Sequence, residues 1–396
     1  MNAISLKILL IVYGLGLLFS VINISFAQNI ADCIESIEDA DGDNILNVWE
    51  EKGIDVNDDQ TVDLNLSGVS NPLHKDIFLE LDYMERHKPN QTAMNQVINT
   101  FANAPVCNPD GKEGIDLHII VDDMITHDGN TLIDCSESKN MTSDSQTNIT
   151  NDDWSEIQDI KNINFGLKSD RDNPNFENIF AAKDLIYNYG VFIHQINNSP
   201  DSGCAHDTDR LFVVSLGNES WWQREDVIGK DVANNDTKSD TEFQARSLMH
   251  ELGHTLGLVH GGDRSLNDLN YKPNYLSVMN YLYLFPDTRM EDVSFLDYSR
   301  CALPSINEVL TDLSKGIDIG DCVGQVNKNM IWVGHHEYNN KTAACMPDQM
   351  VQFNTPVNWS ANKIPGSIFT DINCDGRERD LLKGFNDWEN LIYLRN

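Results

Sequence analysis

Three histidines and one glutamate fall within a single short segment, HELGHTLGLVH, which runs from His250 to His260. Residues four apart on an α-helix share one face, so His250 and His254 can present ring nitrogens to one metal ion. Glu251 then lies beside the open coordination position, where a carboxylate can act as general base. This spacing predicts a catalytic zinc site in which His260 supplies the third imidazole.

The helix that must carry these ligands is predicted from an apolar stripe and from signals at both ends. The stripe lies roughly opposite the two histidines and consists of Ala245, Leu248, Leu252 and Leu256. Ser239 and Glu242 match a capping box at the start, and Gly257 suits the left-handed conformation that ends a helix. A turn at Gly257 would bring His260 back to the metal.

A second motif, SVMNY, covers residues 277–281. Together with the zinc motif it resembles the metzincin zinc metallopeptidases of secreted microbial type, in which a methionine turn forms an apolar floor beneath the metal. The resemblance implies that role for Met279, and it implies that Tyr281 ligates zinc at rest and stabilises the tetrahedral oxyanion. A core tyrosine is the alternative for Tyr281. The resemblance covers residues 239–281, and Gly261 after the third histidine leaves the subfamily open.

The resemblance implies an α/β (α+β) fold, a metzincin-like catalytic domain with a twisted mixed sheet, an active-site helix and an irregular lower subdomain. Apolar periodicity predicts strands over 74–83, 115–121, 191–196 and 211–216, and helices over 91–104 and 176–189. A long polar insertion is expected over 123–175. We expect the strand 211–216 at the sheet edge above the cleft, where an extended peptide substrate can add.

The N-terminus has the pattern of a secretory signal. Lys7 precedes an apolar run from Ile8 to Phe19, and small residues end at Ala27, after which we expect cleavage. An uncleaved membrane anchor is the alternative. No later run is long or apolar enough to span a bilayer. We therefore expect a secreted, extracellular or cell-surface protein with no stable membrane insertion after signal cleavage.

Four segments divide the chain. They are a signal peptide over 1–27, an acidic calcium-loop segment over 28–73, the catalytic domain over 74–340, and a C-terminal segment with a possible calcium loop over 341–396.

Acidic side chains outnumber basic ones by 62 to 28, for a net charge of −34. Such a charge argues against nucleic acid and anionic membranes as partners and favours cations. The clearest cation site has EF-hand-loop spacing, with Asn44 in place of the usual glycine. Its predicted calcium ligands are Asp39, Asp41, Asp43, the Ile45 carbonyl, Asn47 and Glu50. A solvated acidic turn is the alternative.

Two further loops repeat this spacing less completely. The second consists of Asp55, Asn57, Asp59, Thr61 and Asp63, and it lacks a closing carboxylate because Leu66 stands there. The third opens with Asp371, Asn373 and Asp375, and arginines follow it. Calcium in these loops would neutralise carboxylates that repel one another and would stabilise the fold. The predicted cofactors are therefore one catalytic zinc ion and structural calcium.

The eight cysteines follow the predicted signal and lack the close pairs of a zinc ribbon, so disulfides are expected. The short-range candidates are Cys107 with Cys135 and Cys301 with Cys322. A latency role for Cys33, blocking zinc, is an alternative that no surrounding motif supports.

These patterns predict a secreted zinc endopeptidase that hydrolyses peptide bonds of extracellular proteins or peptides, with zinc-bound water activated by Glu251. The alternative is a catalytically silent, calcium-rich surface or matrix-binding protein on a metzincin scaffold. Retention of Glu251 beside all three histidines favours the enzyme. A hydrolase that uses only the short HExxH core is disfavoured, because it would not require Gly257, His260 and the methionine turn together.

Overall fold

The computed structural model describes residues 33, 35–126, 154–196, 201–206, 209–217, 238–264, 269–285, 296–309, 317–323, 330–339, 342–354, 371–373, 375 and 380–393. The predicted signal peptide and Cys135 lie outside these residues. None of the helices in the described part of the chain combines the length and apolar character that crossing a membrane requires.

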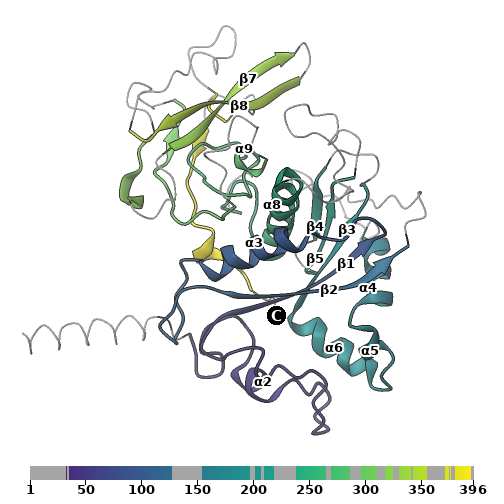
Figure 1. Ribbon diagram of the computed structural model, residues 1–396. Helices are drawn as coiled ribbons and strands as arrows, with labels where there is room; N and C mark the ends of the chain where they lie inside the picture. Colours follow the sequence, from purple (N-terminus) through teal and green to yellow (C-terminus); the bar gives the residue numbers. More distant parts are fainter. Residues whose placement is uncertain are drawn as a thin grey trace, which may run out of the picture.

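A five-stranded mixed sheet forms the centre of the molecule (Figure 1). Its strands, in spatial order, are β2 (Asp116–Ile125), β1 (Asp76–Met84), β3 (Tyr187–Ile193), β5 (Leu211–Ser215) and β4 (Gly203–His206). The first four are parallel, and β4 runs antiparallel to β5 at one edge. Residues on both faces of β1, β3 and β5 are buried, as expected for strands covered on both sides.

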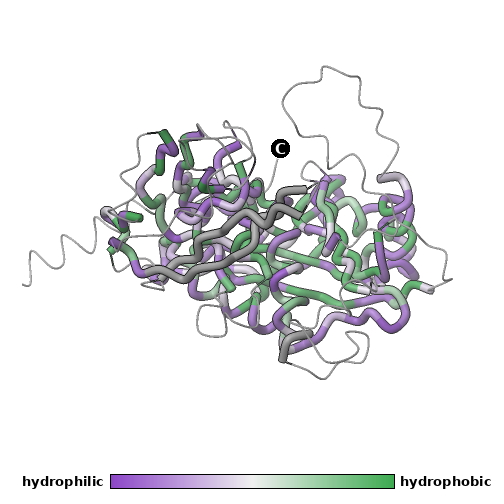
Figure 2. The backbone as a smooth tube through the Cα atoms, turned by 90° about the horizontal axis from the view of Figure 1, so that it is seen from above, coloured by the Kyte–Doolittle hydropathy of each residue, from purple (hydrophilic) through white to green (hydrophobic). Residues whose placement is uncertain are grey.

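Helices cover both faces of this sheet (Figure 1). One face carries α3 (Gln91–Ala102) and the long helix α8 (Lys238–Thr255); the other carries α4 (Ser155–Asn164), α5 (Lys168–Arg171) and α6 (Phe176–Ile186). A hydrophobic core lies on each side, and Figure 2 shows apolar residues concentrated in the central strands. The predicted apolar stripe of α8 is buried in the first of these cores: Ala245, Leu248, Leu252 and Leu256. The fold is therefore α/β, as expected.

The chain after α8 contributes residues such as Met279 and Trp388 to the first core and also forms a third, smaller core. It contains α9 (Tyr281–Leu284), the 3-10 helices η4 (Gly320–Cys322) and η6 (Trp388–Asn390), and two two-stranded sheets. The sheets pair β6 (Ile306–Asn307) with β9 (Leu381–Leu382), and β7 (Met330–Asn339) with β8 (Thr342–Gln352). This part is thus more regular than the irregular subdomain expected. The N-terminal acidic segment contributes α2 (Asn47–Lys52) on the opposite side of the sheet (Figure 1).

The structure differs from the sequence predictions in several places. The helix α6 ends at Ile186, short of the predicted position 189, because residues 187–189 pair with β1. The helices α4 and α5 and the end of β2 lie within the predicted polar insertion. The strand over 211–216 is not the sheet edge, because β4 pairs with its outer side. Helix α8 begins at Lys238, so Ser239 lies inside its first turn and is not the N-cap.

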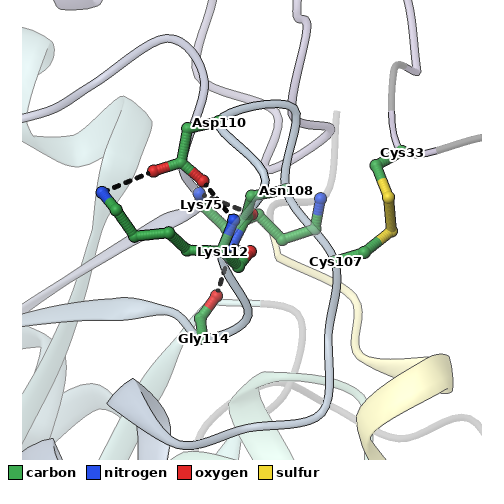
Figure 3. The surroundings of a disulfide bond; sticks show 7 residues. All are labelled: Cys33, Lys75, Cys107, Asn108, Asp110, Lys112 and Gly114. Carbon is green, nitrogen blue, oxygen red and sulfur yellow. Dashed lines mark hydrogen bonds and ion pairs between the residues drawn. A yellow bond between two sulfur atoms is a disulfide. The ribbon is translucent and has the colours of Figure 1, made fainter. Parts of the chain in front are cut away.

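One disulfide links nearby segments of the chain and another links distant ones. The predicted pair Cys301–Cys322 is confirmed. The predicted pair of Cys107 with Cys135 is wrong, because Cys107 bonds to Cys33 across 74 residues (Figure 3). The same bond removes Cys33 from any role in blocking zinc. Cys204 on β4 is also disulfide-bonded.

Candidate metal centre

Three imidazoles converge at the C-terminal end of α8. His250 and His254 lie one turn apart on the helix, and their Nε2 atoms are 3.2 Å from each other. His260 stacks on His250 with ring centroids 5.2 Å apart. One nitrogen from each of the three rings lies within 4.8 Å of the other two. The three side chains could therefore hold one metal ion.

Two backbone carbonyls fix how the helical imidazoles present their nitrogens. His250 Nδ1 lies 2.8 Å from the carbonyl oxygen of Val278. His254 Nδ1 lies 3.0 Å from that of Leu258. Because a carbonyl oxygen only accepts, each Nδ1 carries the proton and each Nε2 presents its lone pair. Burial, reinforced by His254 and His260, holds the pKa of His250 well below its usual value. His250 is therefore neutral, as a metal ligand must be.

A left-handed glycine ends α8 and turns the chain back toward the centre. Gly257 has a φ of +91°, as its predicted role requires. Its N–H donates to the His254 carbonyl at 3.0 Å, and the Leu258 N–H donates to the Gly253 carbonyl at 2.9 Å. A Cβ at position 257 would lie 2.8 Å from Cδ1 of Ile392. Glycine is thus required both for the backbone conformation and for contact with the C-terminal segment.

Replacing Gly257 by alanine should destabilise the fold and weaken metal binding. Gly68 is a matched control, since its φ is +78° and a Cβ there meets nothing within 4 Å. Both alanine variants carry the left-handed backbone cost of about 1–2 kcal/mol. Only Gly257→Ala also collides with Ile392 and disturbs the turn to His260. Thermal unfolding and metal titration of the two variants test this, and equal losses with unchanged metal affinity would contradict it.

Glu251 lies between the histidines and the edge strand β4. Its side chain is buried, and this burial, with a smaller contribution from Asp201, raises its pKa well above the usual value. A Cβ at Gly203, the first residue of β4, would lie 2.4 Å from Oε1 of Glu251. Any larger residue at position 203 would collide with the Glu251 carboxylate, so glycine is needed there. This role of Gly203 was not predicted, because a single glycine carries no motif in the sequence.

The turn that contains Met279 packs against α8 next to the histidines. Met279 is fully buried, and a Cβ at Gly253 would lie 2.5 Å from its Sδ atom. Tyr281 is 42% exposed, and its ring centroid lies 4.4 Å from that of His260. The alternative of a core tyrosine is therefore wrong, and Tyr281 instead flanks the imidazoles.

The acidic loop forms a second cluster of possible metal ligands. Two groups of three carboxylates each have oxygen atoms within 4.8 Å of one another: Asp39, Asp41 and Asp43, and Asp43, Glu50 and Asp76. Asn44 has a φ of 66°, so it adopts the left-handed conformation that its place in the loop demands. Asp76 was not among the predicted ligands, because it lies outside the loop at the start of β1.

Glu50 and Asp41 have buried carboxylate oxygens that no described residue satisfies. Neither oxygen of Glu50 accepts a hydrogen bond from the described part of the chain, nor does Oδ2 of Asp41. Burial, followed by the nearby carboxylates of Asp43 and Asp41, raises the pKa of Glu50 to about 9. Burial likewise raises the pKa of Asp41 to about 7. Carboxylates this buried remain ionised only if a cation compensates them.

The two remaining predicted ligands, Asn47 and Ile45, form hydrogen bonds within this loop. The Asn47 amide oxygen accepts a hydrogen bond from the Ala40 N–H at 3.0 Å, and its nitrogen donates to the Ile37 carbonyl at 2.9 Å. The Ile45 N–H donates to Asp43 Oδ1 at 2.7 Å, and the Ile45 side chain is buried in the second core.

The second predicted loop is held by its own side chains. Asp55 and Asn57 accept hydrogen bonds from the Asp59 N–H, and the Thr61 N–H donates to the Asp59 carboxylate. Asp63 accepts hydrogen bonds from the Val56 N–H at 2.9 Å and from the Asn175 side-chain amide at 2.6 Å. Among the described residues, no three His, Cys, Asp or Glu side chains of this loop come within 4.8 Å of one another.

The third predicted loop is partly described. Asp371 and Asn373 are completely buried, and the Asn373 amide has no hydrogen-bond partner among the described residues. Asp375 donates its N–H to Asp371 at 3.1 Å. Glu308, just after β6, accepts a bond from the Ile372 N–H, and burial raises its pKa to about 7. Glu308 is thus an additional carboxylate beside this loop. It was not among the predicted ligands.

No protein-family model matches the chain, and no curated protein matches it. The fold and the site therefore define its class: an α/β protein with a three-histidine centre that could hold a metal ion.

Proposed function

We propose that this protein is a secreted zinc-dependent endopeptidase of the metzincin kind, which hydrolyses peptide bonds of extracellular proteins. The observation that carries the proposal is the convergence of three imidazoles beside Glu251, which lies against an edge strand of the sheet. The resemblance of the zinc motif and the methionine turn to metzincins supports the same assignment.

The donor set favours zinc. Two Nε2 atoms are oriented by Nδ1 contacts to carbonyls, and a group of three imidazoles suits a catalytic zinc site with one open position. When bound, zinc would polarise the scissile carbonyl and lower the pKa of a coordinated water. A divalent cation beside the buried Glu251 would also favour its carboxylate form.

Two residues around the centre would then have separate catalytic roles. Glu251 would accept a proton from the attacking water and pass it to the leaving amine. Tyr281, whose ring flanks His260, would donate a hydrogen bond from its hydroxyl to the oxyanion that develops on the carbonyl.

Strand β4 supplies an edge to which an extended substrate can add. The Ser215 N–H donates to the Ser202 carbonyl at 2.7 Å, so this directly opposite pair is hydrogen-bonded. In an antiparallel ladder the pattern alternates, which leaves the backbone groups of Gly203 and Ala205 on the outer side. Backbone hydrogen bonds from this edge would hold a peptide without regard to sequence, next to Glu251.

Replacing Ala205 by proline should weaken peptide binding while preserving the fold, because an edge strand tolerates the loss of an outward N–H. One lost hydrogen bond costs about 1 kcal/mol, which corresponds to a roughly fivefold rise in KM. Ala205→Val, which keeps the N–H, is the control. KM values for one peptide substrate would decide the matter, and an unchanged KM in the proline variant would place the substrate elsewhere.

Calcium is the second proposed cofactor. The buried carboxylates of the first acidic loop are oxygen ligands of the type that calcium prefers, and the third loop offers a similar set. The disulfides agree with an oxidising, extracellular location.

Cleavage of casein by the full chain tests the proposal, with zinc-loaded protein compared against protein stripped by a chelator. We expect fragments only from the zinc-loaded sample. Zinc-loaded protein that binds casein or matrix proteins without cutting them would instead support the catalytically silent scaffold.

A further inference from the structure

Asp76 connects the central sheet to the acidic loop. It is the first residue of β1, and its carboxylate lies within 4.8 Å of ligand atoms of Asp43 and Glu50. Its N–H also donates to Asp43 Oδ2 at 2.7 Å. Both oxygens of Glu50 are buried and accept no hydrogen bond from any described residue, so a group with oxygen affinity is required there.

We propose that a calcium ion bound by the acidic loop and Asp76 joins the N-terminal segment to β1 and to the C-terminal segment, and that it thereby slows the loss of zinc from the histidine centre. The inference rests on the proposed zinc and calcium sites and adds a coupling between them.

The ligand chemistry selects a hard cation. All the side-chain donors in the two groups are carboxylate oxygens, with no imidazole or thiolate among them. The positive charge of Lys75 lowers the pKa of Asp41, and the His118 ring bonds to Asp76. Five carboxylates therefore face few balancing cations, and calcium accepts this number of oxygen ligands readily.

The first link of the coupling runs from Asp76 to the C-terminal segment. Lys75 precedes Asp76, and its N–H donates to Asn108 Oδ1 at 3.1 Å, next to the disulfide at Cys107 (Figure 3). The Lys75 ammonium lies 5.8 Å from the ring centroid of Tyr393. Lys75 is the chain neighbour of Asp76, so this contact connects Tyr393 to the residue that joins β1 to the cluster. The C-terminal segment runs toward the acidic segment in Figure 1.

The second link runs from the C-terminal segment to the zinc ligands. The Ile392 N–H donates to the Leu256 carbonyl at 2.8 Å, and the Ile392 side chain packs on Gly257. The same turn presents the Leu258 carbonyl to His254 and leads to His260. Ile392 and Tyr393 are consecutive in the chain. An ion that orders the carboxylate cluster therefore also stabilises the position of Ile392, which packs on the turn at Gly257.

The test measures zinc release from the full chain into a chromogenic chelator, with and without calcium, beside calcium titration by calorimetry. We expect calcium to bind and to slow zinc release about tenfold or more, the range seen when groups that orient metal ligands are lost. Glu50→Gln should lose both effects. Glu51→Gln, an exposed neighbour on α2, should retain both.

A chain ending at Leu391 tests the route. It should still bind calcium, but its zinc release should no longer respond to calcium. The inference is overturned if the wild type binds no calcium, if calcium leaves zinc release unchanged, or if the shortened chain still responds. No step requires peptide cleavage, so a protein that passes this test yet cuts nothing would refute the proposed enzyme and leave the coupling intact.

Discussion

Replacing Glu251 by glutamine should lower kcat for peptide cleavage by about 1000-fold while zinc stays bound. The glutamine side chain has nearly the same size, so it fits the space that Gly203 leaves. It cannot accept the proton of the attacking water, however, and the loss should therefore fall on turnover. Glu251 is not among the three imidazole ligands, so zinc affinity should change little.

Turnover of a fluorogenic peptide and elemental zinc content, measured on the same preparations, check this result. Glu242→Gln, on the same helix, is the control and should keep full activity. A Glu251→Gln protein that retains more than about one tenth of wild-type turnover would show that another group is the base.

Replacing His260 by alanine should reduce zinc affinity by more than about 100-fold. This exceeds the loss typical of removing a group that only orients a metal ligand. Two imidazoles on one helix turn would remain, which is fewer protein ligands than zinc sites normally provide. The fold should survive, because His260 follows the turn and is only partly buried.

Competition with a chelator of known affinity measures the change. His87→Ala is a suitable control: His87 contacts His194 and belongs to none of the groups of possible metal ligands in the described residues. Equal zinc affinity in wild type and His260→Ala would remove His260 from the metal centre.

The histidine centre could be predicted from sequence because its geometry is local. The positions of His250 and His254 follow from helix periodicity, and Gly257 predicts the turn that returns His260. The main strands were predictable for the same reason, since their residues show the burial pattern of a covered sheet.

The missed features depend on tertiary contacts. Strand β4 has only four residues, GCAH, without alternation, and its pairing with β5 decides which strand is the edge. Asp76 joins Glu50 only because β1 passes the acidic loop. The helical pattern continued past Ile186, but pairing with β1 converts residues 187–189 to strand. In each case a long-range contact overrides the local signal.

Zinc content and casein cleavage, followed together as zinc is removed and restored, test the central proposal most directly. We predict one zinc ion per chain, loss of cleavage when it is removed, and recovery in proportion to the zinc regained. A chain that binds no zinc, or one that carries zinc at His250, His254 and His260 and still leaves casein intact, would contradict the proposed enzyme.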